Sequence, residues 1–132
     1  MPIVYHYDPI VDIVRIDATG DVTALEIEAY FEAVVREPWW RPGLRYLADN
    51  RGITTPATSG ALQTGALAAA RTSAYQGGAR VAVLVDSPIA YGLVRQFDAL
   101  ITEAGGVMVP FYHDAEAAAW LRGPPGAMDA QG

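Results

Sequence analysis

The sequence predicts an α/β fold with the element order ββαβαβαβα, in which a mostly parallel central sheet is flanked by helices. Three observations lead to this prediction. Residues 80–86 form an almost continuous apolar run, as expected of a parallel strand that is covered on both faces. After residue 23, helical patterns alternate with short β-rich runs, which is typical of parallel strands joined by right-handed crossovers. Glycine pairs at 77–78 and 105–106 separate helices from the strands that follow them.

The first half of the chain is predicted to hold an antiparallel strand pair, a helix and a third strand. Asp8-Pro9 is a turn signal between the first two strands. Thr23 and Glu26 form a capping box that opens the first helix, which ends before Pro38 because the residue before proline disfavours the helical conformation. The predicted ranges are 3–7 and 10–17 for the strands, 23–37 for the helix and 44–49 for the third strand.

The second half alternates helices and strands. A helix crowded with Ala is predicted over about 58–75, and its small side chains would let it lie close against the sheet. Ser87 is an N-cap with Pro88 at the first helical position, and the helix that follows has an apolar stripe from Ile89 to Ile101. The last strand and helix are predicted at 107–112 and 114–121. The residues expected in the core are Val83, Leu84, Val85, Leu93 and Phe97.

Length and composition indicate one soluble domain. The chain has 132 residues, of which 52% are hydrophobic, and a net charge of −6. We expect a single domain over residues 1–122 and a flexible C-terminal tail over 123–132. No signal peptide and no apolar run of the ~18 residues that a membrane span requires is visible, so a cytoplasmic protein without an integral membrane segment is expected. Without a basic cluster, nucleic acid is a poor partner.

Several kinds of chemistry are excluded by residue types. All nine basic residues are Arg and there is no Cys, which excludes Schiff-base lysines, thiolate nucleophiles and sulfur-ligated metals. His6 and His113 lack metal-site spacing, and His113 beside Asp114 is expected to cap a helix rather than to act as a base. The glycine pair at 77–78 precedes a strand rather than a helix, so it does not form a phosphate-binding loop. The sequence therefore predicts a protein that is not an enzyme and holds no cofactor and no metal.

Short segments in a fixed order carry a family resemblance. They are Gly20-Asp21-Val22-Thr23, residues 47–51, residues 90–97, and residues 111–114 with Glu116, Ala117, Trp120 and Leu121. In this order the chain resembles the STAS domain, named for sulfate transporters and anti-sigma-factor antagonists, and more closely the SpoIIAA-like family, over roughly residues 3–122. The resemblance implies a STAS/SpoIIAA-like fold and a non-enzymatic regulatory module for signalling that acts through a protein partner, such as a kinase or an anti-sigma-like regulator.

The resemblance also implies a regulatory phosphorylation site. In anti-sigma-factor antagonists, the Ser before a Gly in an Asp-Ser-Ser-Gly motif is phosphorylated at the start of the second helix. The matching stretch here is Ala57-Thr58-Ser59-Gly60, which keeps Ser-Gly but lacks the Asp. Ser59 and Thr58 are therefore candidate phosphorylation residues. The alternative is that either hydroxyl is only an N-cap, and both roles are compatible.

Two further groups are candidates for binding a ligand or a partner. Tyr91, Arg95 and Asp98 have the spacing of one helix face, and the alternative is a solvated face with an Arg–Asp pair. Asp49 ends the third strand in a segment that carries the resemblance.

Trp39 and Trp40 fall in a turn between the first helix and the third strand. They are expected to pack over the end of the core or, alternatively, to form a homodimer contact or the lip of an apolar pocket.

Two functions remain open at this point. The first is the regulatory module that acts through protein partners. The second is a carrier or sensor of a small lipophilic ligand in an apolar pocket, because the fold is similar to that of known lipid-binding domains and three Trp, seven Tyr and three Phe are available to line a pocket. An elongated apolar cavity in the structure favours the carrier. A solid core with a flat patch near Ser59 favours the partner module.

Overall fold

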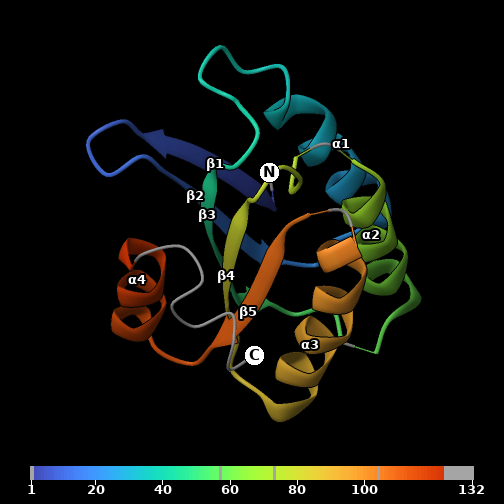
Figure 1. Ribbon diagram of the computed structural model, residues 1–132. Coiled ribbons are helices and arrows are strands. Elements are labelled where there is room, and N and C mark those ends of the chain that lie inside the picture. Colours follow the sequence, from blue (N-terminus) through green and yellow to red (C-terminus); the bar gives the residue numbers. More distant parts are fainter. Residues whose placement is uncertain (1, 57, 73, 104, 124–132) are drawn as a thin grey trace.

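The computed structural model describes residues 2–56, 58–72, 74–103 and 105–123, and forms one five-stranded sheet with four helices in this part of the chain (Figure 1). Most of the predicted tail, residues 124–132, lies outside the described residues. The strands are β1 (Ile3–Asp8), β2 (Ile13–Gly20), β3 (Arg45–Ile53), β4 (Arg80–Leu84) and β5 (Val107–Phe111), and the helices are α1 (Ala24–Val34), α2 (Gly60–Arg71), α3 (Pro88–Glu103) and α4 (Asp114–Arg122).

The sheet confirms the predicted fold class. Its strands follow the order β1-β2-β3-β4-β5, so that every strand lies beside its neighbour in sequence. β1 pairs antiparallel with β2, and the other three pairs are parallel. β4 is buried along its whole length, as the apolar run 80–86 predicted.

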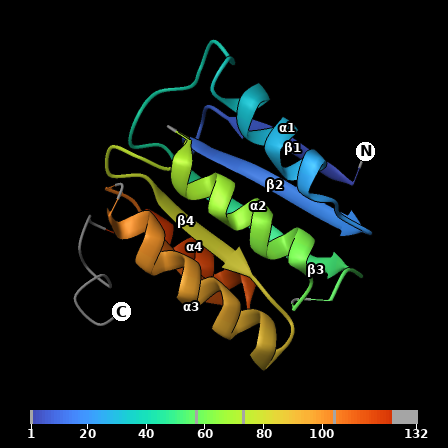
Figure 2. The ribbon, with the colours of Figure 1, turned by 90° about the vertical axis from the view of Figure 1, so that its right-hand side faces the viewer.

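Helices α1, α2 and α3 all cover one face of the sheet, and α4 covers the other (Figures 1 and 2). The cause is the handedness of the connections. Each parallel crossover moves one strand in the same direction, and crossovers with a constant right-handed sense then place every connecting helix on the same side. Only α4, which follows the last strand, is free to fold over the opposite face.

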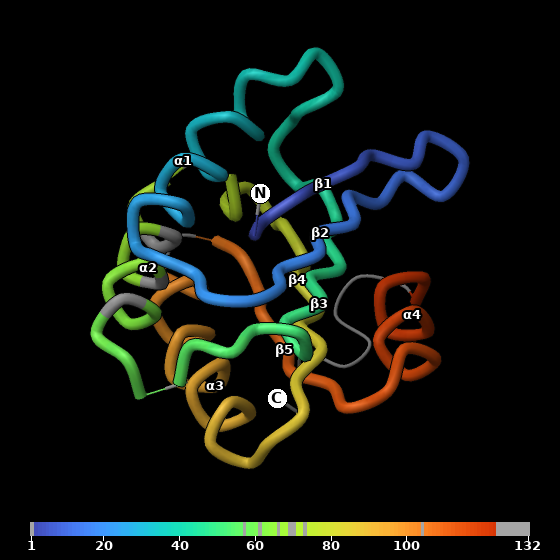
Figure 3. Tube along the Cα trace, turned by 180° about the vertical axis from the view of Figure 1, so that it is seen from behind, coloured from blue at the N-terminus to red at the C-terminus, as the bar shows by residue number. Residues whose placement is uncertain are grey.

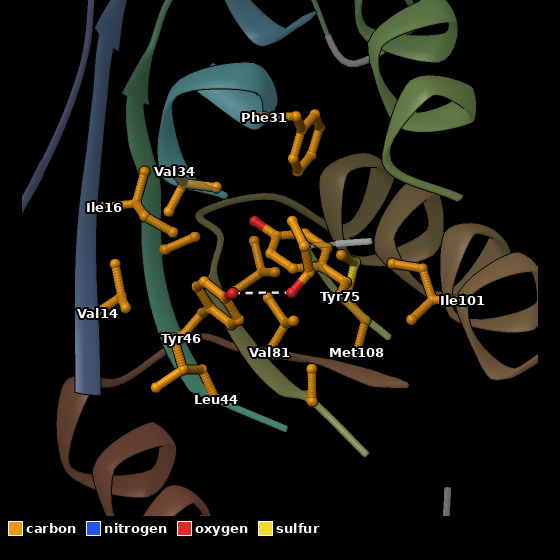
Figure 4. Packing of buried hydrophobic residues seen from close by; sticks show 14 of the residues in the cluster. Val14, Ile16, Phe31, Val34, Leu44, Tyr46, Tyr75, Val81, Ile101 and Met108 are labelled. Carbon is orange, nitrogen blue, oxygen red and sulfur yellow. Dashed lines mark hydrogen bonds between the residues drawn. The ribbon is translucent and has the colours of Figure 1, made fainter. Parts of the chain in front are cut away.

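The larger apolar cluster lies beneath α1, α2 and α3 (Figure 4). Side chains of a strand alternate between the two faces, so each strand sends every second residue toward these helices. The strand residues on this side are Val14 and Ile16 of β2, Tyr46 and Ala48 of β3, Val81 and Val83 of β4, and Met108 of β5. From the helices, Phe31, Val34 and Ile101 complete the cluster.

A smaller cluster lies beneath α4, where Trp120 and Leu121 pack on Leu84 and Phe111. Arginines at the start of two strands hold the end of this helix. Arg45 donates to the carbonyl oxygen of Leu121, and Arg80 donates to that of Trp120. The Arg80 guanidinium also lies 4.4 Å from the centre of the Trp120 ring. Cations at a helix C-terminus are favourable because they face its unpaired carbonyl groups.

The β1–β2 turn is longer than predicted. The second strand begins at Ile13 rather than at residue 10, and residues 9–12 form the turn, which extends away from α1, α2 and α3 (Figure 3). Asp12 closes it with a positive φ of 59°, a conformation that Asp tolerates, and pairs with Arg41. Ile10, placed in a strand by the sequence, is 92% exposed in the turn. Alternation of apolar residues alone did not distinguish strand from turn.

Helix boundaries agree better with the sequence than helix burial does. Thr23 is the N-cap of α1 and accepts a hydrogen bond from the Glu26 N–H at 3.2 Å, which confirms the capping box. In α3, however, Ile89 is 64% exposed, so its place in the predicted buried stripe is wrong. Leu93 and Phe97 are half-buried rather than core residues, since they face a cavity.

Candidate functional site

A cavity of about 380 Å³ lies between the sheet and helices α1, α2 and α3. Val81 and Val83 of β4, and Val85 directly after it, follow one another along its wall. At a rise of roughly 3.3 Å per residue they span about 13 Å, so the cavity is elongated along the strand direction. The other apolar lining residues are Ile3, Ile16, Ala18, Val22, Ile27, Tyr30, Phe31, Ala48, Ile53, Pro56, Leu62, Gly65, Tyr75, Ala90, Leu93, Val94, Phe97 and Met108.

The composition of α2 explains why this space is not filled. α2 packs against α1 and α3, and it faces the cavity with Leu62 and Gly65. A Cβ atom at Gly65 would lie 2.3 Å from Cδ1 of Ile27, so α1 and α2 approach closely at this point. The sequence predicted that small residues would bring α2 against the sheet. Instead they bring it against its neighbouring helix, and a helix held from the sides leaves space beneath it.

Aromatic side chains close the cavity near the amino ends of the strands. Tyr75 contacts Phe31 and Tyr46 edge-on, with ring centres 5.1 and 4.8 Å apart. The hydroxyl groups of Tyr30 and Tyr75 are hydrogen-bonded at 3.1 Å, and the Tyr46 hydroxyl donates to the Ala74 carbonyl oxygen. Burial raises the pKa of Tyr30 and of Tyr75, and raises the pKa of Tyr46 to about 12, so all three stay protonated and neutral at physiological pH. This end of the cavity is therefore uncharged.

Polar residues gather at the other end, where β3 and β4 finish. Asn50, Thr54, Thr55, Asp86 and Ser87 line the cavity there. Thr55 donates to the carboxylate of Asp21 at 2.7 Å and accepts from the Val22 N–H at 2.8 Å. Ser87 accepts from the Ala90 N–H at 3.1 Å, which makes it the predicted N-cap of α3. These bonds fix the shape of the polar mouth.

The volume corresponds to a small organic molecule. Ligand pockets range from about 300 to 1,000 Å³. A 150 Å³ apolar cavity accommodates benzene, so simple scaling of this cavity gives a molecule of roughly fifteen non-hydrogen atoms. Apart from the Tyr30 and Tyr75 hydroxyl groups, which bond to each other, the polar groups lie at one end, and this arrangement suits an amphipathic or apolar molecule that enters lengthwise.

One solved structure with the same architecture is an uncharacterised protein of the DUF3478 family from Shewanella loihica, described as having a SpoIIAA-like fold. The two structures superpose with a TM-score of 0.60 over 90% of this chain and 91% of that chain, at 16% sequence identity. The chain has a SpoIIAA-like fold. No protein-family model and no curated protein sequence matches it. At this identity the likeness shows the fold, which confirms the resemblance inferred from the sequence segments at the level of architecture.

In this SpoIIAA-like fold, the candidate phosphorylation residues lie directly before α2. The Ser59 carbonyl accepts from the Gln63 N–H at 3.2 Å, so Ser59 is at the N-cap position, and Thr58 is exposed. Ala57 of the motif lies outside the described residues. The segment continues from Thr54, Thr55 and Pro56, which line the cavity mouth.

The candidates on α3 are used within the fold. Asp98 accepts from the Met108 N–H at 2.9 Å and so joins the helix to the start of β5. Tyr91 stacks on Tyr112 with ring centres 5.3 Å apart. Arg95 is exposed. The interactions of Tyr91 and Asp98 are structural, and neither side chain lines the cavity.

Asp49 lies on the α4 side of the sheet, since its neighbour Ala48 faces the cavity. It forms ion pairs with Arg51 at 2.9 Å and Arg15 at 3.3 Å, and Arg51 also pairs with Asp114 at 2.9 Å. The hydrogen bonds and charge of Arg51 hold the pKa of Asp49 below its ordinary value. This network ties β2 and β3 to the first turn of α4.

Trp39 and Trp40 pack against the core. Trp39 stacks on Tyr7 with ring centres 4.8 Å apart, and the Trp40 indole N–H donates to the Tyr46 hydroxyl at 3.1 Å. Both are half-buried and neither lines the cavity.

The structure therefore does not bring the predicted site residues together. Asp49 is on one face, the α3 residues are on the other, and the two Trp residues lie beyond the end of α1. Sequence reasoning missed the polar mouth around Asn50 and the role of Gly65. The sequence did hold a signal for the role of Gly65, because a Gly in the middle of a predicted helix lowers stability unless close packing requires it.

Within the described residues, no group of three or more acidic, His or Cys side chains is placed to hold a metal ion. Among the described residues, each helix is too short or too polar to span a lipid bilayer.

Proposed function

We propose that this protein binds a small lipophilic molecule in the cavity beneath α2 and acts as a carrier or sensor of it. The observation that supports the proposal is the elongated 380 Å³ cavity with apolar walls and a polar mouth. Cores of small domains are normally packed to the density of organic crystals, and voids larger than a water molecule are few. A cavity of this size lowers stability unless a ligand fills it.

The position of the cavity also supports ligand binding. Its mouth is at the carboxyl ends of β3 and β4, and ligands of open α/β sheets bind outside this edge. The sheet forms one wall of the cavity, and the opposite wall includes α2, which packs against α1 and α3.

Binding of the neutral fluorescent probe N-phenyl-1-naphthylamine tests the proposal. The wild-type protein is expected to enhance the probe's fluorescence with saturation at one site. Substituting Leu for Ala48 on β3 or for Ala90 on α3 places extra methyl groups in the cavity and should abolish most of the enhancement. Ala119→Leu is the matched control, since Ala119 is exposed on α4 and adds the same bulk outside the cavity.

Native mass spectrometry of protein purified from its own host identifies the natural ligand. A co-purifying molecule of a few hundred daltons, present in the wild type and lost in Ala48→Leu, is the expected result. Its presence at a hundredfold excess over Kd should raise the free energy of unfolding by about 2.7 kcal/mol. Absence of probe binding together with absence of any co-purifying molecule would overturn the proposal.

A second candidate function is a regulatory module switched by phosphorylation of Ser59. It is supported by the position of Ser59 at the N-cap of α2, where free N–H groups and the helix dipole favour negative charge, and by the exposure of Thr58 beside it. A phosphate there would change the surface seen by a protein partner with little cost to the fold.

Pull-down from the host with wild-type, Ser59→Asp and Ser59→Ala baits tests this second function. Asp is a good N-cap, so Ser59→Asp should keep stability while weakening partner binding; Ser59→Ala should keep binding while losing about 1 kcal/mol of cap stability. Equal recovery of the same proteins by all three baits would leave Ser59 as a cap only.

A further inference from the structure

The charge around the cavity points to the chemical class of the ligand. We propose that the ligand is an uncharged lipophile whose polar end, a hydroxyl or carbonyl group, hydrogen bonds to Asn50 and Thr54 at the mouth. The inference rests on the proposed function, which it narrows from any lipophilic molecule to a neutral one.

No positively charged side chain of the described residues faces the cavity. Among the described residues that line it there is no Arg or His, and the sequence has no Lys. A carboxylate or phosphate headgroup drawn into this site would lose its water without gaining a counter-charge. Burying an unpaired charge is far more costly than burying a neutral hydrogen-bonded group.

The acidic residues at the mouth add repulsion against an anion. Asp86 lines the cavity, and Asp21 is hydrogen-bonded to Thr55 on the same rim. Like charges placed close to a headgroup select against anionic ligands by repulsion. Asp86 is exposed, so solvent screens its repulsion of an anion and its attraction for a cation alike. The main penalty on a charged headgroup of either sign is therefore the loss of its water, and the acidic residues make this penalty larger for an anion than for a cation.

Helix N-termini near the mouth offset little of this repulsion: Ser59 and Gly60 at the start of α2 do not line the cavity, and side-chain or carbonyl caps occupy part of the first-turn N–H groups of α1 and α3. In α3, Pro88 has no N–H, and the N–H groups of Ala90 and Tyr91 bond to the side chain and the carbonyl oxygen of Ser87. In α1, the N–H groups of Glu26 and Ile27 bond to Thr23 in the same way. An anion would have to displace these caps.

Neutral hydrogen-bonding groups are present instead. The Asn50 side chain offers both donors and an acceptor and lines the cavity where β3 ends. Throughout the described ranges, no protein hydrogen bond engages the side chains of Asn50 or Thr54, in contrast to Thr55 and Ser87. An amide beside a hydroxyl matches an alcohol, aldehyde, ester or amide headgroup.

Displacement of N-phenyl-1-naphthylamine from the wild-type protein by ligands that share one chain length tests the inference. The competitors are 1-dodecanol, methyl dodecanoate, dodecanoate and dodecylammonium, at pH 7.5. We expect the two neutral compounds to displace the probe at concentrations at least about tenfold lower than dodecanoate, because the ester and the carboxylate differ mainly in charge. Dodecylammonium should displace the probe only at higher concentrations than 1-dodecanol does.

Two substitutions assign the effect to residues. Asn50→Leu should weaken the binding of 1-dodecanol about three- to tenfold, the value of one hydrogen bond, when its affinity is expressed relative to that of the probe for the same variant. Asp86→Asn should strengthen the binding of dodecanoate several-fold. Glu103→Gln is the matched control, since it removes one negative charge at the far end of α3 and should change none of the affinities.

The outcomes separate this inference from the proposed function. If the probe does not bind, the proposed function itself fails. If the probe binds and dodecanoate displaces it as well as methyl dodecanoate does, or dodecylammonium exceeds dodecanol, the protein still binds lipophiles but the inference of an uncharged ligand is overturned.

Discussion

The two faces of the sheet differ in how completely their apolar side chains fill the space beneath the helices. On the α4 face, the large side chains of Leu84, Phe111, Trp120 and Leu121 pack directly between one helix and the strands. On the other face, three helices cover more strands, yet a 380 Å³ cavity remains beneath the middle one. The larger helical layer therefore produces the less complete core.

The difference teaches that what a helix contacts matters more than how many helices are present. α4 is tied to the strands themselves, through Arg45 and Arg80 at its C-terminal end and Arg51 at its first turn. α2 is tied mainly to α1 and α3. A helix held by the sheet must fill the space between them, whereas a helix held by its neighbours can bridge an opening.

The largest expected effect tests the density of the α4 face. Trp120 is 3% exposed and contacts Phe111 and Arg80. Trp120→Ala should lower the free energy of unfolding by about 3–5 kcal/mol. Phe97→Ala, on the cavity side, should cost only about 1–2 kcal/mol, since the Phe97 ring is half-buried and already borders empty space. If urea denaturation shows equal losses in the free energy of unfolding for both variants, the two faces do not differ in packing density.

A pair of identical substitutions on the two faces gives the next effect. Ala82 is fully buried on the α4 side, so Ala82→Leu forces extra methyl groups into packed space and should cost about 1–3 kcal/mol. Ala48→Leu places the same groups in the cavity and should change stability by less than about 1 kcal/mol. Denaturant melts of both variants measure this. A larger loss for Ala48→Leu would show that the cavity is not open to new atoms.

Two helix glycines test how α2 is held. Gly65→Ala should lower stability by about 1 kcal/mol, because the added Cβ meets Ile27 and separates α1 from α2. At Gly92 of α3 an added Cβ meets no atom within 4 Å, so Gly92→Ala should raise stability by about 0.5–1 kcal/mol through helix propensity. Thermal melts of the two variants should shift in opposite directions. A shift in the same direction would show that α1 and α2 do not depend on this contact.

The smallest expected effect is the pH dependence of the ion pairs on the α4 side. Arg51 holds the pKa of Asp49 below the ordinary 3.8, so the native state favours the ionised carboxylate. This stability is complete above pH 3.8 and is lost as the pH falls through the lower native pKa. Asp49→Asn should lower the free energy of unfolding by up to about 1 kcal/mol at pH 7. The free energy of unfolding of this variant should also fall less steeply than that of the wild type as the pH is lowered.

Asp114→Asn serves as the comparison for Asp49→Asn, because the Asp114 side chain is 55% exposed against 18% for Asp49. Its effect at pH 7 should be smaller. Lipophile binding should be unchanged in both variants, since this network lies across the sheet from the cavity. Stability of Asp49→Asn that follows pH in the same way as the wild type would contradict the assignment.

Local signals predicted much of the fold. The apolar run of β4, the capping box of Thr23 and Glu26, and the N-cap at Ser87 each appear where the sequence placed them. These features depend on residues close in the chain, whose conformational preferences act without the rest of the fold. The exposure of Ile10 and Ile89 escaped prediction, since periodicity shows which residues can be buried and not whether a partner surface reaches them.

The candidate site was predicted less well than the fold. The Ala-rich composition of α2 was recognised, but the contact between Gly65 and Ile27 joins residues far apart in sequence. The polar mouth combines Asn50 of β3 with Asp86 after β4 and the loop containing Thr54. None of these spacings forms a local motif, so Gly65 in the middle of a predicted helix was the main sequence signal for the pocket.

The sequence by itself determined the element order, the mostly parallel sheet and the absence of Lys and Cys chemistry. Each of these follows from local preference or from composition, and the handedness of crossovers then limits the topology. Only the tertiary structure decided that one face is filled and the other is hollow. The space beneath α2 depends on how three helices pack against one another, and the distances between helices are set by contacts between side chains that the chain order keeps far apart.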